Sequence, residues 1–399
     1  MALACSSSRL LAWALILGTL AGCSTLAPEP EAPPPAPEAA APVRVTGAVQ
    51  RPRALWVAAS WSELPGWDDD RVAQVWPALR AGCARPAPGW AATCARALAA
   101  TPADDGEARS WLRQWLQPWR IESLDGVRDG LATGYFEPLV EASRRRVGRF
   151  KVPLYGWPAG TPLPTWTRAQ SETLPAAQAA LRGHEIAWVA DPLDALLLQI
   201  QGSGRLLVNE PDGSRHLVRL AFAGHNDQPY RSVGAWLIQQ GEIAPGAASW
   251  PAIRAWARLN PQRVQQLLWA NPRLVFFREE PLADPKLGPR GGQGVALVPG
   301  RSIAVDPASI PYGTAVWIET TEPLSSTPLR RIVMAQDTGG AIVGAVRADL
   351  FWGWGAEAEA QAGRMKQPLR VWALWPRGGR PEGVVSAAPG SRAVAASAQ

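Results

Sequence analysis

Residues Arg331 to Gly355 read RIVMAQDTGGAIVGAVRADLFWGWG, and this stretch predicts both a fold and a site. The apolar run Ile332 to Ala335 has the character of a buried strand and leads directly towards Asp337. Gly339 and Gly340 follow, and because glycine adopts backbone angles that side chains forbid, the chain is expected to turn sharply there. An ordinary hairpin, in which Asp337 bonds the amides of its own turn, explains the same pattern equally well.

A second carboxylate, Asp349, precedes a cluster of aromatic residues and glycines. Its neighbours Leu350, Phe351 and Trp352 are apolar, and apolar surroundings disfavour the charged form, which raises the pKa and allows proton donation near neutral pH. Asp337, beside glycine amides, is expected to be the better stabilised carboxylate, so the two pKa values should differ and divide the roles of acid and support. Trp352 beside glycine offers a flat face suited to a sugar ring.

The sequence offers few other reagents. Its three histidines are too few and too dispersed for a zinc site or a Ser-His-Asp triad, and no Gly-x-x-x-x-Gly-Lys loop is present. We therefore predict no metal and no cofactor. An aspartic peptidase would need two matching Asp-Thr/Ser-Gly loops, and the sequence has only the one at Asp337.

The segment QIQGSGR, from Gln199 to Arg205, is a second candidate binding element. It lacks the third glycine and the following helix of a dinucleotide-binding fingerprint, and Leu196 to Ile200 before it is expected to be a strand. Its amides, hydroxyl and bare backbone suit hydrogen bonds to N-acetyl and hydroxyl groups. A tight hairpin is an equally good interpretation.

The N-terminus predicts export and lipidation. Arg9 precedes the apolar stretch Leu10 to Leu20, which is too short to span a bilayer and typical of a signal-peptide core. Small residues then lead to Cys23, as in the processing box of lipoproteins. Ser24 after this cysteine favours the outer membrane by resemblance to lipoprotein sorting rules. Ala27 to Val43 is almost entirely Ala, Pro and Glu, which is typical of an extended linker.

Charge and cysteine content agree with an exported protein. The formal net charge of +6 is mild and the arginines are scattered, so we expect no nucleic-acid partner. Cys83 and Cys94 remain after export and are close in sequence, which predicts a disulfide, with two free thiols as the alternative. Asp68, Asp69 and Asp70 are expected to cap a helix and face solvent rather than bind a metal.

Several motifs, in this order, resemble the family of membrane-bound lytic murein transglycosylase A. They are Thr133-Gly134-Tyr135, Gln201-Gly202-Ser203-Gly204, Pro229-Tyr230-Arg231-Ser232-x-Gly234, Ala304-Val305-Asp306-Pro307, Asp337-Thr338-Gly339-Gly340-Ala341-Ile342, Arg347-Ala348-Asp349 and Phe351-x-Gly-x-Gly. The resemblance spans Ser62 to Trp375. The three aspartates also resemble the three-aspartate domain of other cell-wall proteins. This chain departs at Arg347-Ala348, where some members and the related expansins have His-Phe and a gap one residue shorter.

The resemblance implies a mainly β fold with some α structure. A double-psi β-barrel catalytic domain would be formed by the N- and C-terminal segments 46–137 and 285–376, with a second β-rich, glycan-binding domain, 138–284, inserted between them. Composition adds a lipoprotein signal peptide at 1–22, a lipidated cysteine and linker at 23–45, and a disordered tail at 377–399.

The resemblance also implies a reaction. Family enzymes cleave the β-1,4 bond between N-acetylmuramic acid and N-acetylglucosamine without water and leave a 1,6-anhydromuramoyl end. Most glycosidases need two carboxylates. Here one suffices because the muramoyl 6-hydroxyl is the nucleophile, so Asp349 is assigned as general acid and then base, Asp337 as its support and Asp306 as structural. The predicted substrate-binding residues are Thr133, Gly134, Tyr135, Gln201, Gly202, Ser203, Gly204, Gly339, Gly340 and Trp352.

The expected partners are peptidoglycan glycan strands, the outer membrane through a lipid anchor on its periplasmic face, and cell-wall synthases. The alternative function is a non-catalytic peptidoglycan-binding outer-membrane lipoprotein, because three-aspartate and double-psi domains can bind glycans without cutting them.

Overall fold

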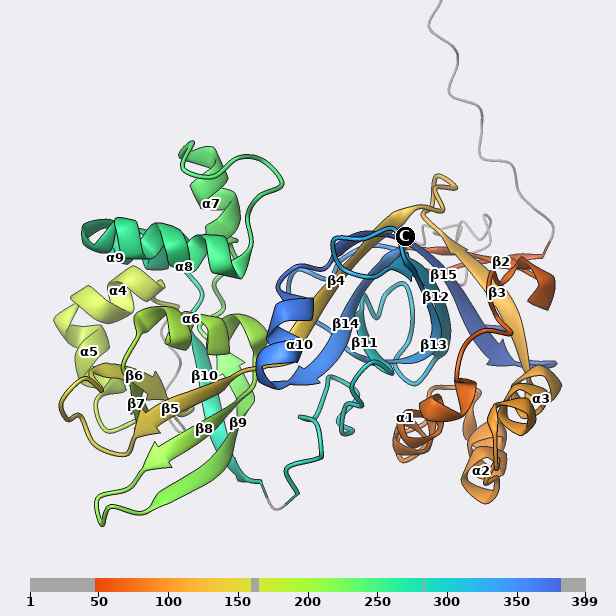
Figure 1. The fold of residues 1–399 in the computed structure, drawn as a ribbon, viewed down its shortest axis with the longest axis horizontal. Coiled ribbons are helices and arrows are strands. Elements are labelled where there is room, and N and C mark those ends of the chain that lie inside the picture. The colour runs from red at the N-terminus through yellow and green to blue at the C-terminus, as the bar shows by residue number, and fades with distance from the viewer. Residues whose placement is uncertain (1–46, 159–164, 283, 382–399) are drawn as a thin grey trace, which may run out of the picture. The chain divides into compact units, whose positions relative to one another are not determined.

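A computed structural model describes residues 47–158, 165–282 and 284–381 (Figure 1). The predicted signal peptide, the lipidation site Cys23, the linker 23–45 and residues 382–399 of the predicted tail lie outside the described residues. Within them, no helix is both long enough and apolar enough to cross a membrane.

The larger sheet closes into a barrel (Figure 1). Its closed part consists of β4 (Gly130–Glu137), β11 (Ser302–Val305), β12 (Ala315–Thr321), β13 (Pro328–Asp337), β14 (Arg347–Trp354) and β15 (Lys366–Pro376). The order is β15-β12-β13-β11-β14-β4, and a further pairing of β15 with β4 completes the ring. Three more strands extend the sheet from β15, namely β3 (Leu116–Glu122), β2 (Leu55–Ala58) and β1 (Ala48–Gln50).

The strand register brings the two candidate aspartates together. β11 pairs with β13 in parallel and with β14 antiparallel, and Ala304 of β11 lies opposite both Asp337 and Asp349. β14 also pairs in parallel with β4, which places Thr133 opposite Asp349. Because residues directly opposite one another in a sheet project from the same face, both carboxylates lie on one side of this four-strand region.

Short helices from the N-terminal part of the chain pack against the barrel. They are η1 (Trp61–Glu63), η2 (Val72–Val75), α1 (Trp76–Gly82), α2 (Ala91–Ala99) and α3 (Asp105–Trp115). A disulfide joins Cys83, which follows α1, to Cys94 in α2. Asp104 caps α3, because its side chain accepts a hydrogen bond from the Glu107 amide at 2.9 Å.

The prediction that Asp70 caps a helix and faces solvent is wrong. Its carboxylate is buried instead of facing solvent, and it caps no helix. It accepts hydrogen bonds from both terminal guanidinium nitrogens of Arg301, at 2.8 and 2.9 Å, and from the Ile332 amide at 2.9 Å. A bidentate pair of this kind fixes geometry as well as charge, so Asp70 attaches the start of η2 to β13.

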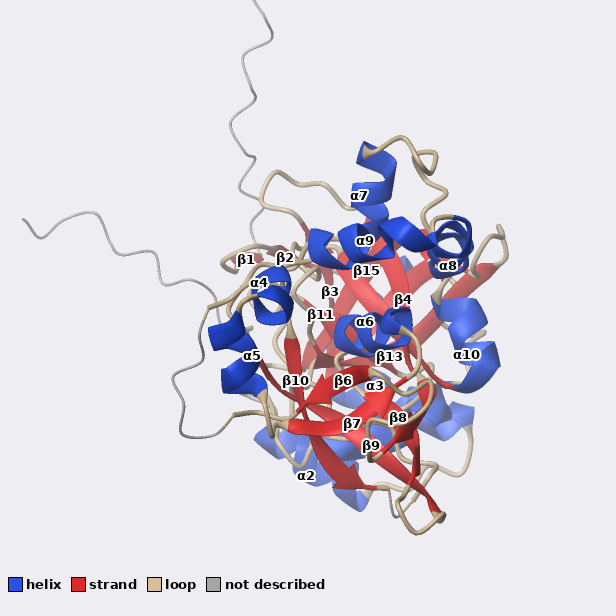
Figure 2. Ribbon diagram, turned by 90° about the vertical axis from the view of Figure 1, so that its left-hand side faces the viewer, coloured by secondary structure: helices blue, strands red, loops and turns tan. Residues whose placement is uncertain are grey.

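The second sheet has the order β10-β9-β8-β5-β7-β6. Its strands are β5 (Leu139–Ser143), β6 (Val152–Tyr155), β7 (Glu185–Val189), β8 (Gly204–Asn209), β9 (Arg215–His225) and β10 (Val275–Pro281). Its helices are α4 (Arg168–Thr173), α5 (Pro175–Leu181), α6 (Pro192–Gln201), α7 (Val233–Gln239), α8 (Trp250–Leu259), η3 (Pro261–Arg263) and α9 (Val264–Ala270). Helices α7, α8 and α9 lie close together (Figure 2). Together with α6 they share one cluster of buried apolar side chains.

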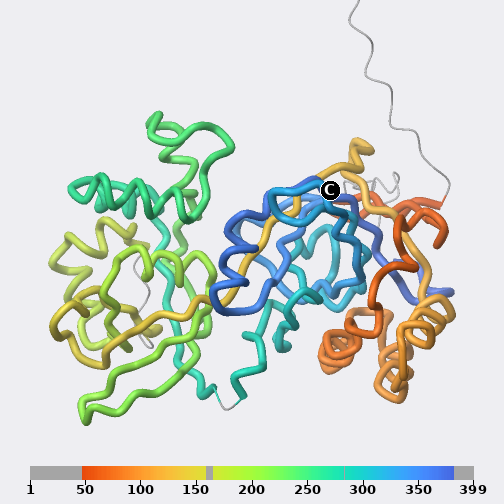
Figure 3. Tube along the Cα trace, viewed as in Figure 1, coloured from red at the N-terminus to blue at the C-terminus, as the bar shows by residue number. Residues whose placement is uncertain are grey.

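The predicted fold class is confirmed, with a barrel formed from N- and C-terminal segments and a second β-rich region formed from the chain between them (Figure 3). The domain boundaries at 138 and 284 stay a prediction. The strand expected at Leu196 to Ile200 is wrong, because these residues belong to α6. Asp191 caps this helix and Pro192 occupies its first turn, and both are start signals that favour a helix over a strand.

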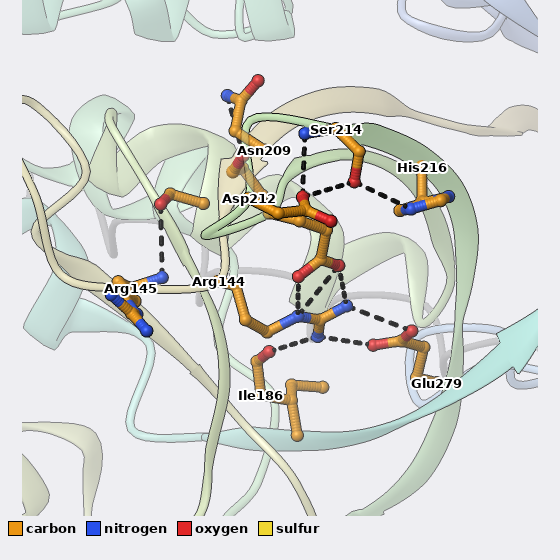
Figure 4. Close-up of polar contacts among 11 residues, drawn as sticks. Arg144, Arg145, Ile186, Asn209, Asp212, Ser214, His216 and Glu279 are labelled. Atoms are coloured by element: carbon orange, nitrogen blue, oxygen red, sulfur yellow. Dashed lines mark hydrogen bonds and ion pairs between the residues drawn. The ribbon is translucent and has the colours of Figure 1, made fainter.

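Charged side chains join several strands of the second sheet, near the residues at which β5 and β8 end (Figure 4). Arg144, next to β5, donates to Glu210 at 2.8 Å, to Glu279 of β10 at 2.8 Å and to the Ile186 carbonyl at 2.8 Å. The hydrogen bond from Arg144 holds the pKa of Glu210 below its usual range. One guanidinium therefore joins β5, β7, β10 and the turn between β8 and β9.

A buried cluster joins the two sheets. Glu137, the last residue of β4, is fully buried and accepts hydrogen bonds from the Nε atoms of Arg205 and Arg219, each at 2.7 Å. Both arginines also donate to the Leu287 carbonyl on the returning chain. The guanidinium of Arg205 lies 4.0 Å above the ring of Trp354, at the end of β14.

We predict that Glu137→Gln lowers the free energy of unfolding by about 3–5 kcal/mol, because it leaves two buried guanidinium groups without a counter-charge. Denaturant unfolding of the full chain measures this. The control is Glu141→Gln, which removes a carboxylate from the exposed pair with Arg149 and should cost about 0–1 kcal/mol. Equal losses in the two variants would contradict the role given to Glu137.

Candidate active site

A cavity of about 1200 Å³ collects residues from both sheets. Its lining includes Asp337 and Asp349, the Thr338 to Ile342 loop, the Gln199 to Ser203 end of α6, and Gly291 with Gly292. The volume suits a ligand larger than a single small molecule, since typical pockets measure about 300–1,000 Å³. An extended ligand could therefore contact both sheets at once.

Asp349 is half-buried and held by its neighbour on β4. The Thr133 hydroxyl donates to Asp349 Oδ1 at 2.6 Å, and Arg347 Nη2 donates to the same Thr133 oxygen at 2.9 Å. Burial, with a smaller contribution from the charge of Asp337, raises the pKa of Asp349 to about 6, against the hydrogen bond from Thr133 and the charge of Arg347. Asp349 can therefore hold a proton close to neutral pH.

Asp337 is a carboxylate with three donors. The Tyr135 hydroxyl donates to Oδ2 at 2.8 Å, and the amides of Gly292 and Thr338 donate to Oδ1 at 2.8 and 2.9 Å. Burial raises its pKa, and these three hydrogen bonds oppose that rise. Burial and the charge of Asp337 raise the pKa of Tyr135 well above its usual value, so the phenol remains the donor.

The glycine whose amide donates to Asp337 is not one of the neighbouring glycines that the sequence suggested. It belongs to Gly292, far away in sequence, whereas Gly339 and Gly340 are exposed on the cavity wall. The loop from Gly291 to Gly294 must approach closely, because a Cβ on Gly291 would lie 2.5 Å from the Gln336 carbonyl oxygen. The clustered glycines at 291, 292 and 294 were the sequence signal for this loop.

Trp352 does not line the cavity, contrary to the prediction. It follows Phe351 on β14, and successive side chains of a strand point to opposite faces, so Trp352 faces away from Asp349. Its indole packs against Gly134, where a Cβ would lie 2.6 Å from Nε1, and this Nε1 atom donates to Met365 Sδ at 3.4 Å. Phe351, on the same face as Asp349, instead contacts the Tyr135 ring at 5.2 Å.

The Gln201 to Gly204 segment is a helix end, not a hairpin. Gly202 ends α6 with a φ of 74°, a left-handed conformation that glycine adopts without strain. Gln201, Gly202 and Ser203 line the cavity, and the Gln201 side-chain oxygen accepts from the Phe136 amide at 3.1 Å. Gly204 is buried against Leu198, where a Cβ would lie 2.1 Å from Cδ2, so it belongs to the core and not to the cavity wall.

The remaining predicted residues divide between two roles. Gly134 and Tyr135 line the cavity, whereas Thr133 acts on Asp349 through its hydroxyl. Asp306 accepts from Arg53 at 3.0 Å and from the Gly344 and Ala308 amides at 2.9 and 3.0 Å, contacts that fit the structural role predicted for it.

Sequence reasoning missed the arginines of the cavity. Those that line it are Arg85, Arg273, Arg278, Arg290 and Arg347. These arginines are scattered along the sequence, and their spacing does not indicate that they share a site. Arg347 is the exception, because it lies two residues before Asp349 on the same face of β14.

Comparison with known proteins identifies the type of enzyme. Residues 131–278 match the model of the MltA specific insert domain, and residues 301–375 match the model of the 3D domain. Membrane-bound lytic murein transglycosylase A of Escherichia coli K12 is 32% identical over 277 residues, which cover 67% of this chain and 72% of that protein. With its barrel and its carboxylate-bearing cavity, this protein is a lytic transglycosylase acting on peptidoglycan.

Two solved structures agree. Lytic transglycosylase LtgG of Burkholderia pseudomallei is 46% identical, with a TM-score of 0.56 over 84% of this chain and 98% of that chain. The structure of E. coli MltA with bound chitohexaose is 26% identical, with a TM-score of 0.58 over 79% and 89% of the two chains. The chain belongs to the MltA family, and it carries the 3D domain.

We predict that Asp349→Asn stabilises the fold increasingly as pH rises. The folded-state pKa of about 6 lies above the value of about 3.9 expected in the unfolded chain, so the contribution of Asp349 to stability is fully present below about pH 4 and is lost as pH rises through about 6. Asparagine does not titrate. The difference in Tm between variant and wild type should therefore grow from pH 4.5 to pH 8. Asp129→Asn, at an exposed carboxylate, is the control, and a difference that does not change with pH would contradict the raised pKa.

Proposed function

We propose that this protein cleaves the β-1,4 bond between N-acetylmuramic acid and N-acetylglucosamine without water and leaves 1,6-anhydromuramoyl ends. The observation that carries the proposal is Asp349, a cavity carboxylate whose pKa is raised to about 6 and whose position is fixed by Thr133. A general acid works best with a pKa near the operating pH. The chitohexaose bound to the E. coli relative supports a glycan strand as the ligand.

The reaction balances with a single catalytic carboxylate. Protonated Asp349 donates its proton to the glycosidic oxygen as the bond from that oxygen to C1 of the muramoyl residue breaks. The muramoyl 6-hydroxyl oxygen then bonds to C1, and its proton returns to Asp349, now acting as a base. No water is consumed, and Asp349 ends in the protonation state in which it began.

Asp337 supports this cycle without transferring a proton. Its negative charge raises the pKa of Asp349 and so favours the acid form. The same charge would stabilise the positive charge that develops at C1 in the transition state. Tyr135, Gly292 and Thr338 fix the carboxylate in place, so it needs no rearrangement during the reaction.

The sugars would contact residues that line the cavity, and we assign Tyr135, Gln201, Ser203 and the glycines 134, 202, 339 and 340 to this role. The segment 138–284 would act as an inserted glycan-binding domain. A lipid on Cys23 would hold the protein at the periplasmic face of the outer membrane, as the sequence and the membrane-bound relatives suggest.

The mass of the products tests the proposal. Purified peptidoglycan incubated with the full chain should release muropeptides lighter by one water than hydrolytic products. Asp349→Asn should lower the rate by about 10²–10⁴-fold, the usual contribution of general acid–base catalysis, while Asp337→Asn costs less. Circular dichroism and glycan binding of both variants serve as controls for folding. Hydrated products would indicate a hydrolase with a second working carboxylate, and intact glycan would favour the non-catalytic lipoprotein.

The pH profile tests the assignment of the acid. Activity should fall as pH rises above the pKa of Asp349, because the proton to be donated is lost. Thr133→Val removes a hydrogen bond that lowers this pKa, so the alkaline limb of kcat/KM should move to higher pH. Thr173→Val, at an exposed position of α4 outside the cavity, is the control. An alkaline limb that stays in place or moves to lower pH would argue against Asp349 as the acid.

A further inference from the structure

The cavity carries an excess of positive charge. Five arginines line it, against the carboxylates of Asp337, Asp349 and Glu280. Arg278 pairs with Glu280 at 2.9 Å, whereas Arg85, Arg273 and Arg290 form no salt bridge with any residue that the structure describes. The buried Arg205 and Arg301 elsewhere in the molecule each have a carboxylate partner. Guanidinium groups gathered in a concave surface attract anionic ligands.

Arg273 lies beside the loop that follows Asp337. Its Nε donates to the Gln228 carbonyl at 2.8 Å, which fixes the plane of the guanidinium. The Nη1 atom approaches the loop so closely that a Cβ on Gly340 would lie 2.8 Å from it. Within the described residues neither Nη1 nor Nη2 of Arg273 has a protein acceptor, so the N–H groups of these two atoms remain available to a ligand. The charge of Arg273 also helps burial to lower the pKa of His225 on the cavity wall.

Arg85 lies against the other loop that reaches Asp337. A Cβ on Gly294 would lie 2.2 Å from Arg85 Nη1, so the guanidinium rests on the Gly291 to Gly294 segment, whose Gly292 amide bonds Asp337. Its guanidinium donates to no acceptor within the described residues. Arg85 thus comes from the N-terminal helical segment, and Arg273 comes from the chain before β10. Each lies against a glycine-containing loop that is next to Asp337 in sequence or in space.

We propose that Arg85 and Arg273 bind carboxylates on the peptide stems of peptidoglycan, so that the cavity selects strands by the charge of their stems. The proposal rests on the proposed function. The sugar backbone of the polymer is uncharged, and free carboxylates on the stems are its anionic groups. A planar guanidinium with both terminal nitrogens free matches a carboxylate through two parallel hydrogen bonds.

A binding experiment isolates charge from size. Soluble strands that carry stem peptides are compared with the same strands after their carboxylates have been converted chemically to amides. The full chain with Asp349→Asn is used to prevent turnover, and binding is followed by calorimetry. We expect unmodified strands to bind at least about tenfold more tightly than amidated ones, and this preference should shrink as salt is raised.

Variants assign the preference to the two arginines. The double variant Arg85→Gln/Arg273→Gln should weaken binding of unmodified strands about tenfold more than binding of amidated ones. Arg273→Lys keeps the charge but loses the two-nitrogen fork, so it should retain only part of the preference. The control is the double variant Arg182→Gln/Arg258→Gln, at two exposed positions outside the cavity, which removes the same two charges and should leave the preference intact. Thermal unfolding checks that each variant is folded.

The outcomes separate this proposal from the one on which it rests. The role of the arginines would be overturned if the preference for unmodified strands survived in the double variant Arg85→Gln/Arg273→Gln, or if the parent chain with Asp349→Asn showed no such preference. Either result would hold even if the wild type releases anhydro products. Failure of the wild type to cleave any peptidoglycan would instead count against the proposed function, and the binding comparison would still decide the role of the arginines.

Discussion

The buried carboxylate of Glu137 holds together the parts on which the site depends. It neutralises Arg205 and Arg219 from the second sheet, and both arginines reach the returning chain at Leu287. Glu137 ends β4, and its partner in the strand register is Trp354 at the end of β14, the ring on which Arg205 lies. The strands that carry Thr133, Tyr135 and Asp349 therefore end at one charge cluster. Since charges taken out of water are costly unless they are paired, this cluster favours one arrangement of the junction.

The barrel topology supplies the second constraint. Asp337 and Asp349 end up beside each other because both lie opposite Ala304, one across a parallel pairing and one across an antiparallel pairing. A hairpin between β13 and β14 would place them by local turn geometry, whereas β11 inserted between them fixes their separation through the sheet. Burial is the main cause of the raised pKa of Asp349, and this placement adds the negative charge of Asp337 to it.

The strands that carry Asp337 and Asp349 could be predicted from the sequence, but most of the residues that contact these carboxylates could not. Apolar runs before Asp337 and around Asp349 carry their own signal, so the strands and the two carboxylates could be recognised. Partners brought by topology are harder to predict: the glycines around Gly292 indicate a tight loop but not its contact with Asp337, and Arg273 leaves no local pattern. Trp352 was misplaced although the alternation of a strand already turns it away from Asp349. The strand predicted at Leu196 to Ile200 failed because a short apolar run is ambiguous, and the Asp191-Pro192 start signal should have decided it.

A single acid is sufficient only if it carries a proton when the glycan is in place. In the open cavity Asp349 has a pKa of about 6, set by burial and Asp337 on one side and by Thr133 and Arg347 on the other. A glycan strand that fills the cavity removes water and so further disfavours the charged form, which moves the pKa upwards towards neutral pH. Stem carboxylates held at Arg85 and Arg273 would add negative charge and act in the same direction. Binding of the proper polymer would then strengthen the tendency of Asp349 to carry the proton that the reaction requires, which links selection of the substrate to the state of the catalyst.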